Sequence, residues 1–309
     1  MNRSGIFPSK VGFARDESSN GSGRGQAATM WGWRGVTGQC VVRVVAQLAL
    51  TAILLVPSAT SRAETLRLGG TGILLETMRG LGAAYTADHP ETRVEVLPSL
   101  GTPGGIRALL ARRIDIALTS RPLTDKDKGD GLEEAVCATT AYVFATTYTG
   151  PYSVTKATLP SLYANPQPVW PDRTPLKIIL RSRAGTARQY LSTLVPGMAA
   201  ALDAAYARPG MPVSATDQVN AELATRVAGS FAFMTLMQMQ SERLALRALP
   251  FEGVTPTPQT IADRTYPLLI QGCAVIHRIA SAEVQKFIVY MKSTVGQALV
   301  RQHGAISAD

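Results

Sequence analysis

The 309-residue sequence contains few of the side chains on which metal and nucleophilic chemistry usually depend. Its three histidines, His89, His277 and His303, match no metal-ligand spacing. The sequence has no G-x-S-x-G segment, so a hydrolase would have to use Ser99 or Ser120 without a nucleophile elbow. We therefore expect a binding protein and not an enzyme, with no catalytic residue, no metal and no cofactor. A secreted phosphatase remains the less favoured alternative.

Cysteine is also scarce, with three residues in the whole chain. Cys40 precedes the apolar core of a predicted leader, where a lipid-modified cysteine would not lie. Cys137 and Cys273 remain in the predicted mature chain. They can form a disulfide in an oxidising compartment, but their spacing alone does not pair them, and two buried thiols are the alternative.

The sequence has an apolar run at residues 44–56, which is too short and wrongly flanked for a typical membrane span. Arg34 and Arg43 precede this run, and small residues follow it up to Ala63. This order of basic, apolar and small residues predicts a cleaved secretory signal peptide. We therefore assign residues 1–63 to an N-terminal extension and signal peptide.

Basic runs interleaved with aromatic residues are absent, so the net charge of +9 does not indicate a nucleic-acid partner. The predicted leader contains seven of the 31 basic residues and two of the 22 acidic ones. The mature chain, which begins near Glu64, therefore carries a small positive excess of four. Such an excess assists the capture of a small anion at most. Translation can start at Met1 or at Met30.

Residues 66–122 form the most informative stretch of the mature chain. Apolar residues alternate in 66–68, recur at helical spacing from 73 to 84, and form two further short runs at 94–96 and 114–118. Glycine-rich or hydroxyl-rich turns separate these segments. Strands that alternate with helices predict an α/β fold with parallel strands and right-handed crossovers.

Each of three turns in this stretch places a hydroxyl residue among small neighbours after a predicted strand. The turns are Thr71-Gly72, residues 101–105 with Thr102, and residues 119–122 with Ser120 and Arg121. A helix start has unpaired N–H groups and a partial positive charge, which favour an anion. One such turn is usually only a helix cap, but three in succession predict an oxyanion pocket.

A fourth turn of this kind follows the predicted strand 176–180. Arg181 stands directly after the strand, and Gly185-Thr186 precedes the next predicted helix. A guanidinium is a fixed, charged fork that suits a tetrahedral oxyanion. Arg183 can instead face solvent. Further strands are expected at 142–147, 231–234 and 266–276, and a closing amphipathic helix at 282–300.

The segments GGTGILLETMRGLGAAY (69–85) and PSLGTPGGIRALLARRIDIALTSRPL (98–123) resemble the phosphate-binding proteins of bacterial phosphate ABC transporters. The later YPL and GQAL segments fit the same family. The resemblance implies a periplasmic-binding-protein type II fold with two α/β lobes. Each lobe is expected to contain a mixed, mostly parallel sheet flanked by helices, with the ligand cleft between them. Lobe 1 is then 64–147 plus 267–309, and lobe 2 is 148–266.

The resemblance also implies the ligand, the partner and the compartment. The ligand is inorganic phosphate, which a monomeric periplasmic protein delivers to an ABC transporter permease in the inner membrane. By position, the anion-binding residues are Thr71, Gly72, Thr102, Ser120, Arg121, Arg181, Gly185 and Thr186.

Two departures from the family keep other ligands open. Some members have an aspartate in the third turn that accepts the proton of monohydrogen phosphate, where this chain has Ser120. The fourth turn has Ala184 where a serine is usual. Tungstate, molybdate and sulfate are therefore alternative ligands, and a sensory role is an alternative to transport.

Overall fold

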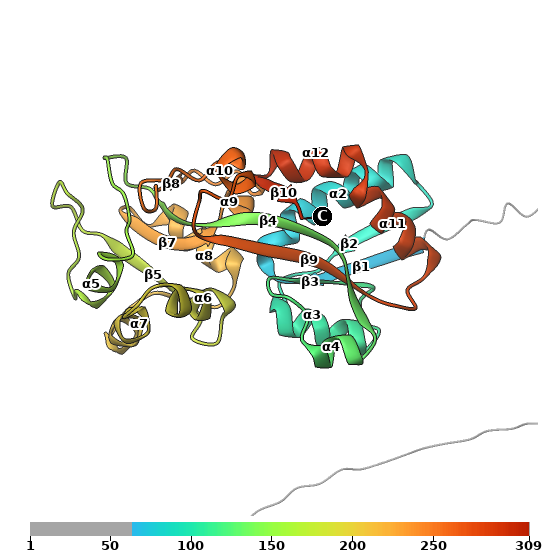
Figure 1. The fold of residues 1–309 in the computed structure, drawn as a ribbon, viewed down its shortest axis with the longest axis horizontal. Helices are drawn as coiled ribbons and strands as arrows, with labels where there is room; N and C mark the ends of the chain where they lie inside the picture. The colour runs from blue at the N-terminus through green and yellow to red at the C-terminus, as the bar shows by residue number, and fades with distance from the viewer. Residues whose placement is uncertain (1–63, 309) are drawn as a thin grey trace, which may run out of the picture. The chain divides into compact units, whose positions relative to one another are not determined.

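The computed structural model describes residues 64–308. The predicted signal peptide, with its cleavage site near Ala63 and with Cys40, lies outside the described residues. The described chain forms a ten-stranded mixed sheet in the order β2-β1-β3-β9-β4-β7-β5-β6, and β8 and β10 also pair with β4 (Figure 1). Helices pack against this sheet, so the α/β class predicted from the sequence is confirmed.

One half of the sheet is parallel and comes from the first sixty described residues. The strand β1 (Glu64–Gly70) pairs with β2 (Thr92–Val96) and β3 (Ile116–Thr119). A short 3-10 turn, η2 (Gly72–Leu74), and the helix α2 (Leu75–Asp88) connect β1 to β2, and α3 (Gly101–Leu110) connects β2 to β3. The carboxyl ends of β1 and β3 therefore lie together, as the alternating pattern predicts.

The other half of the sheet repeats this arrangement. Here β5 (Lys177–Arg181) pairs in parallel with β6 (Val213–Ser214) and β7 (Ser230–Thr235). The connecting helices are α6 (Thr186–Leu194), α7 (Met198–Ala207) and α8 (Asp217–Arg226).

Two long antiparallel strands, β4 (Leu132–Thr146) and β9 (Leu269–His277), join the halves through the middle of the sheet (Figure 1). β9 pairs with β3, and β4 pairs with β7. The sequence predicts a strand only from residue 142, because the charged residues before it resemble a solvated turn. The strand begins ten residues earlier, and its exposed start includes Glu133 and Glu134.

The closing segment contains two helices, α11 (Ala282–Lys292) and α12 (Thr294–Gln302), where the sequence pattern predicts one. Ser293 ends the first helix in an extended conformation, and its side chain accepts a hydrogen bond from the Gly296 amide. A serine cap thus starts a new helix inside one apolar pattern. The remaining elements are α4 (Asp125–Gly129), α5 (Leu159–Ala164), α9 (Leu236–Ser241), β8 (Arg247–Ala248), α10 (Pro258–Ala262) and β10 (Ala305–Ser307).

Buried apolar side chains gather separately in the two halves. The larger cluster packs β5, β7 and the second part of β4 against helices that include α6 and α7. In the first half, α2, α11 and α12 pack on one face of β1 and β3, while α3 covers the other face. Each half therefore has its own core, and β4 and β9 connect the two. Within residues 64–308, every helix is too short or too polar to span a bilayer.

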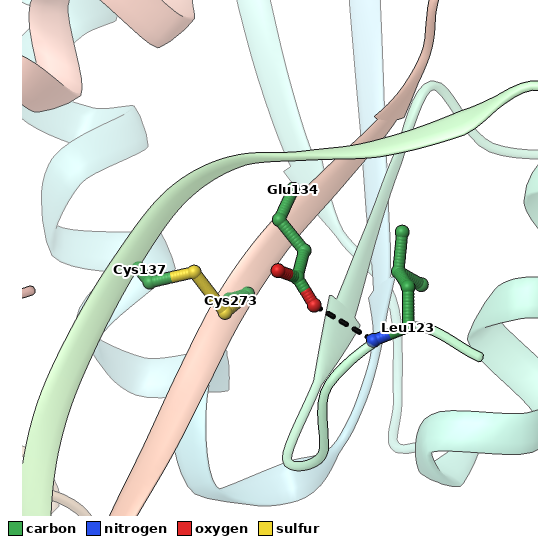
Figure 2. Close-up of a disulfide and its surroundings, with 4 residues drawn as sticks. All are labelled: Leu123, Glu134, Cys137 and Cys273. Carbon is green, nitrogen blue, oxygen red and sulfur yellow. Dashed lines mark hydrogen bonds between the residues drawn. A yellow bond between two sulfur atoms is a disulfide. The ribbon is translucent and has the colours of Figure 1, made fainter. Parts of the chain in front are cut away.

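A disulfide joins the two connecting strands in the first half. Cys137 on β4 and Cys273 on β9 are register partners, and their sulfur atoms are bonded (Figure 2). This pairing decides between the two alternatives that the sequence leaves open. Glu134 lies beside the disulfide, and its carboxylate accepts a hydrogen bond of 2.7 Å from the Leu123 amide. Disulfide sulfurs are not thiolates, so this acid and cysteine cluster is not a metal site in this oxidised form.

Candidate oxyanion site

A cavity of about 290 Å³ lies where the carboxyl ends of β1, β3 and β5 approach one another. Residues from both halves of the sheet line it, together with a tyrosine of β4. Those used below are Thr71, Ser99, Thr102, Ser120, Tyr142, Arg181, Ala184, Gly185, Thr186, Thr216 and Asp217. The structure therefore brings together six of the eight predicted site residues, which are separated by up to 115 positions in the sequence.

The wall from the first half carries hydroxyl groups and no charged side chain, and we call it the neutral wall (Thr71, Thr102 and Ser120). All three residues are buried. The Thr102 hydroxyl accepts a hydrogen bond of 2.9 Å from the Ser120 amide, and the two hydroxyl oxygens are 3.2 Å apart. Among the described residues, the Thr71 side chain makes no capping bond to its helix. Its hydroxyl remains available to a ligand.

Glycine permits the close approach of backbone that builds this wall. Gly70 has φ +151°, and a Cβ there would lie 2.0 Å from the Leu118 carbonyl oxygen of β3. A Cβ on Gly105 would lie 2.8 Å from the Gly70 Cα, so α3 packs directly against the end of β1. Larger residues at these positions would separate the turns that carry Thr71, Thr102 and Ser120.

The helix starts that line the cavity lack side-chain caps, with α8 as the exception. No side chain caps η2, α3 or α6 at the cavity. Away from the cavity, α2, α5 and α7 also lack a side-chain cap, whereas hydroxyl side chains cap α4 and α8–α12. The first N–H groups of a helix have no intrahelical partner. At Thr186 and Ala187, which open α6 and line the cavity, these N–H groups can bind an anion. The third turn differs from the expectation, because α4 begins only at Asp125, so Ser120 contributes a hydroxyl but no helix start.

The wall from the second half carries both charged groups of the cavity, and we call it the charged wall (Arg181, Thr186 and Asp217). Arg181 Nη2 lies 2.5 Å from Asp217 Oδ1, and both side chains are about 15% exposed. Arg181 Nη1 donates to the Thr216 carbonyl oxygen at 3.3 Å, and the buried Nε has no partner among the described residues. The pairing holds the guanidinium at the cavity and leaves it donor capacity for a ligand.

Asp217 and Tyr142 line the cavity, but the sequence does not reveal them as candidates. Thr216-Asp217 has the appearance of an ordinary helix start, and the pairing with Arg181 spans 36 positions. Tyr142 resembles a β-forming core residue. Burial raises its pKa above the ordinary value, so its hydroxyl stays protonated at neutral pH and can donate a hydrogen bond. No sequence signal points to these roles, because both depend on tertiary contacts.

Gly72 is placed against the charged wall and does not itself line the cavity. A Cβ on Gly72 would lie 2.6 Å from Asp217 Cβ and from Gln218 Oε1. Gln218 also donates a hydrogen bond of 3.0 Å to the Gly72 carbonyl oxygen. The η2 turn of the first half and the start of α8 are therefore in contact beside the cavity.

Residues 56–294 match the family model of the PBP superfamily domain. The chain belongs to the PBP superfamily. No curated protein matches the sequence.

Solved structures with the same fold include three oxyanion-related proteins. One is a Clostridium perfringens protein described as a phosphate ABC transporter substrate-binding protein, solved with bound phosphate. It is 17% identical to this chain, with a TM-score of 0.67, and the match covers 80% of this chain and 100% of that one. A Vibrio cholerae ABC-type phosphate transport receptor is 21% identical with a TM-score of 0.54, over 79% and 99% of the chains. The Azotobacter vinelandii periplasmic molybdate-binding protein is 14% identical with a TM-score of 0.52, over 79% and 100%. These likenesses show the type II fold of periplasmic binding proteins.

In this PBP superfamily member, Arg121 lies away from the cavity. Its guanidinium is 3.1 Å from Asp127 Oδ2 and donates to the Pro122 carbonyl oxygen. Arg183 faces solvent, which is the alternative that the sequence leaves open for this residue. Its guanidinium carbon lies 4.2 Å from the centre of the Tyr206 ring.

The three histidines also lie elsewhere, although Ser99 and Ser120 line the cavity. His89 lies beside Glu91, His277 accepts from the Ile279 amide, and His303 contacts Thr77. No imidazole is therefore positioned to activate either serine.

Proposed function

We propose that this chain is an exported solute-binding protein that captures inorganic phosphate between two lobes and delivers it to an ABC transporter permease. The observation that carries the proposal is the cavity itself. Buried hydroxyl groups and uncapped helix starts surround it, and a single guanidinium supplies positive charge. Such a lining can replace the hydration shell of a small oxyanion with fixed donors.

The donors are sufficient in strength for physiological capture. Hydrogen bonds to a charged group contribute roughly 1.5–3 kcal/mol each. Micromolar affinity requires about 8 kcal/mol in total, so a few such bonds from the two walls reach it. The ligand-binding residues of the proposal are Thr71, Thr102, Ser120, Arg181, Gly185 and Thr186, with Asp217 and Tyr142 added from the geometry.

Asp217 favours phosphate over other oxyanions. A carboxylate only accepts hydrogen bonds, and monohydrogen phosphate has a proton to donate whereas sulfate has none at neutral pH. The aspartate that some family members carry in the third turn is absent here, and Asp217 places a carboxylate in the cavity from a different element. The solved relatives described as phosphate-binding support the same ligand.

We further propose that the lobes are 64–147 plus 267–309 and 148–266, and that they close about β4 and β9. The contact of Gly72 with Asp217 and Gln218 then belongs to the closed form. Export to the periplasm follows from the leader sequence, and the Cys137–Cys273 disulfide is compatible with an oxidising compartment.

Titration calorimetry of the mature chain tests the proposal. Phosphate should bind with a dissociation constant in the micromolar range or below, and sulfate, molybdate and tungstate should bind more weakly. Absence of binding heat and of thermal stabilisation with every oxyanion would contradict it. Stronger binding of molybdate or tungstate than of phosphate would replace the proposed ligand and leave the oxyanion site in place.

A further inference from the structure

A second hollow, of about 580 Å³, adjoins the oxyanion cavity. Five residues line both spaces: Thr102, Pro103, Ser120, Ala184 and Thr186. The two spaces therefore lie next to each other on either side of these residues. A phosphate ion has five heavy atoms, and a water molecule occupies about 30 Å³ of liquid, so the first cavity alone has room for the bare anion.

The wall of the second hollow is largely apolar. Pro103, Pro122, Leu194 and Ile270 contribute carbon surface, and the ring of Tyr190 adds to it. An oxyanion that leaves water needs hydrogen-bond donors, and this surface supplies few. The wall is suited to contact with carbon.

Tyr190 holds this wall in position. Its hydroxyl donates a hydrogen bond of 2.7 Å to the Leu269 carbonyl oxygen, so it is already satisfied. Its ring lies 4.8 Å from the ring of Tyr142, which lines the oxyanion cavity. The aromatic pair thus connects the lining of one space to the lining of the other.

The charged residue of the hollow is paired and partly exposed. Arg121 pairs with Asp127 and donates to the Pro122 carbonyl oxygen. The Arg121 side chain is 34% exposed, against 14% for Arg181, so water screens its charge, and the apolar surface of the hollow fits an uncharged substituent. Gln189 and Thr193 add polar groups at its edge.

We propose that the site accepts alkylphosphonates and organic phosphate monoesters as well as inorganic phosphate. The tetrahedral head lies between the neutral and charged walls, and the carbon substituent lies along Pro103, Tyr190, Leu194 and Ile270. This inference rests on the proposed function, because the head must first bind as an oxyanion.

Calorimetry with inorganic phosphate and with methyl-, ethyl-, propyl- and butylphosphonate tests the inference. Affinity should rise about fourfold for each added methylene that the wall covers. A flat or falling series, with inorganic phosphate still bound, would overturn the inference and leave the proposed function intact. Failure of every ligand to bind, inorganic phosphate included, would remove both.

A variant that fills the second hollow tests whether the alkyl substituent binds there. Thr193 is exposed at the edge of the hollow, so Thr193→Trp can fill the space without disturbing the core. The variant should remove the gain with chain length and keep the affinity for inorganic phosphate. Thr193→Ala is the matched control and should behave like the parent protein. An undiminished gain in Thr193→Trp would show that the substituent lies elsewhere, against the proposal.

Discussion

The two walls of the oxyanion cavity are built from the same kind of strand–turn–helix unit, but they differ in charge. The neutral wall offers hydroxyls and peptide groups that the glycine-dependent contacts of β1, β3 and α3 hold in place. The charged wall has Arg181 and Asp217 paired at its centre. Fixed dipoles accept any small oxyanion, whereas a cation and a carboxylate side by side respond to the charge and protonation of the ligand.

Arg181→Met should have the largest effect on this comparison. It removes the cavity's cation and leaves the Asp217 carboxylate unpaired against the anion. The loss of two charged hydrogen bonds predicts a decrease of about a hundredfold or more in phosphate affinity by calorimetry. Arg183→Met, which changes a solvent-facing arginine of the same loop, should bind normally.

The double variant Arg181→Met/Asp217→Asn separates the two charges. It should recover part of the lost affinity, because the unpaired carboxylate is gone. If Arg181→Met binds phosphate as tightly as the parent protein, the neutral wall alone binds the anion. The charged wall would then contribute nothing to phosphate affinity.

Asp217→Asn should change selectivity more than affinity for phosphate. The amide removes the repulsion that the carboxylate exerts on fully ionised sulfate. It also replaces one acceptor oxygen, which serves only a protonated ligand, with an NH2 donor. We expect the ratio of phosphate to sulfate affinity to fall about tenfold, which corresponds to about 1.4 kcal/mol. Competition calorimetry at pH 7 measures this ratio.

Asp203→Asn is the matched control for that experiment. Asp203 pairs with Arg188 at 2.7 Å, is 58% exposed and does not line the cavity. Its replacement should leave the ratio unchanged. An unchanged ratio in Asp217→Asn as well would exclude the carboxylate as the selective group.

Gly72→Ala should weaken the contact between the two walls. The added methyl would lie 2.6 Å from Asp217 Cβ, so the η2 turn and the start of α8 must move apart. Overpacking of this kind costs about 1 kcal/mol, which predicts about a fivefold lower affinity. Small-angle scattering with saturating phosphate should also show a less closed form.

Gly80→Ala provides the comparison for Gly72→Ala. Gly80 lies in α2, away from the cavity, and a Cβ there would meet Leu299 of α12 at 3.6 Å, an ordinary contact. Alanine is the better helix former, so stability should rise slightly while binding stays the same. Equal binding by Gly72→Ala and the parent would mean that the contact beside the cavity does not limit closure.

The neutral wall is the part of the cavity lining that the sequence predicts well. Thr71, Thr102 and Ser120 are found because each follows a short apolar strand, and parallel strands bring such turns together. Arg181, Gly185 and Thr186 are found by the same local signal in the second half. These predictions need only the strand and turn pattern.

The remaining features depend on contacts between distant segments. Asp217 reaches the cavity because α8 begins beside the end of β5, and Tyr142 does so because β4 extends through both halves. Arg121 matches the pattern and yet lies outside the cavity, since α4 begins late and Asp127 pairs with it. The early start of β4 is hidden in the sequence by its exposed glutamates.

Removal of the disulfide, with Cys137→Ser and Cys273→Ser together, should have the smallest effect on binding. Cys273 is the register partner of Thr119, which precedes Ser120, so the disulfide supports the neutral wall and not the charged one. A bridge between residues 136 positions apart stabilises the fold by about 2–4 kcal/mol, which predicts a Tm lower by about 5–10 °C. Phosphate affinity should change less than about threefold, because the hydrogen-bonded pairing of β1 with β3 still positions the hydroxyls.

A reductant should lower the Tm of the parent protein and leave that of the double variant unchanged. A loss of affinity as large as that of Arg181→Met would instead mean that the two walls do not act separately.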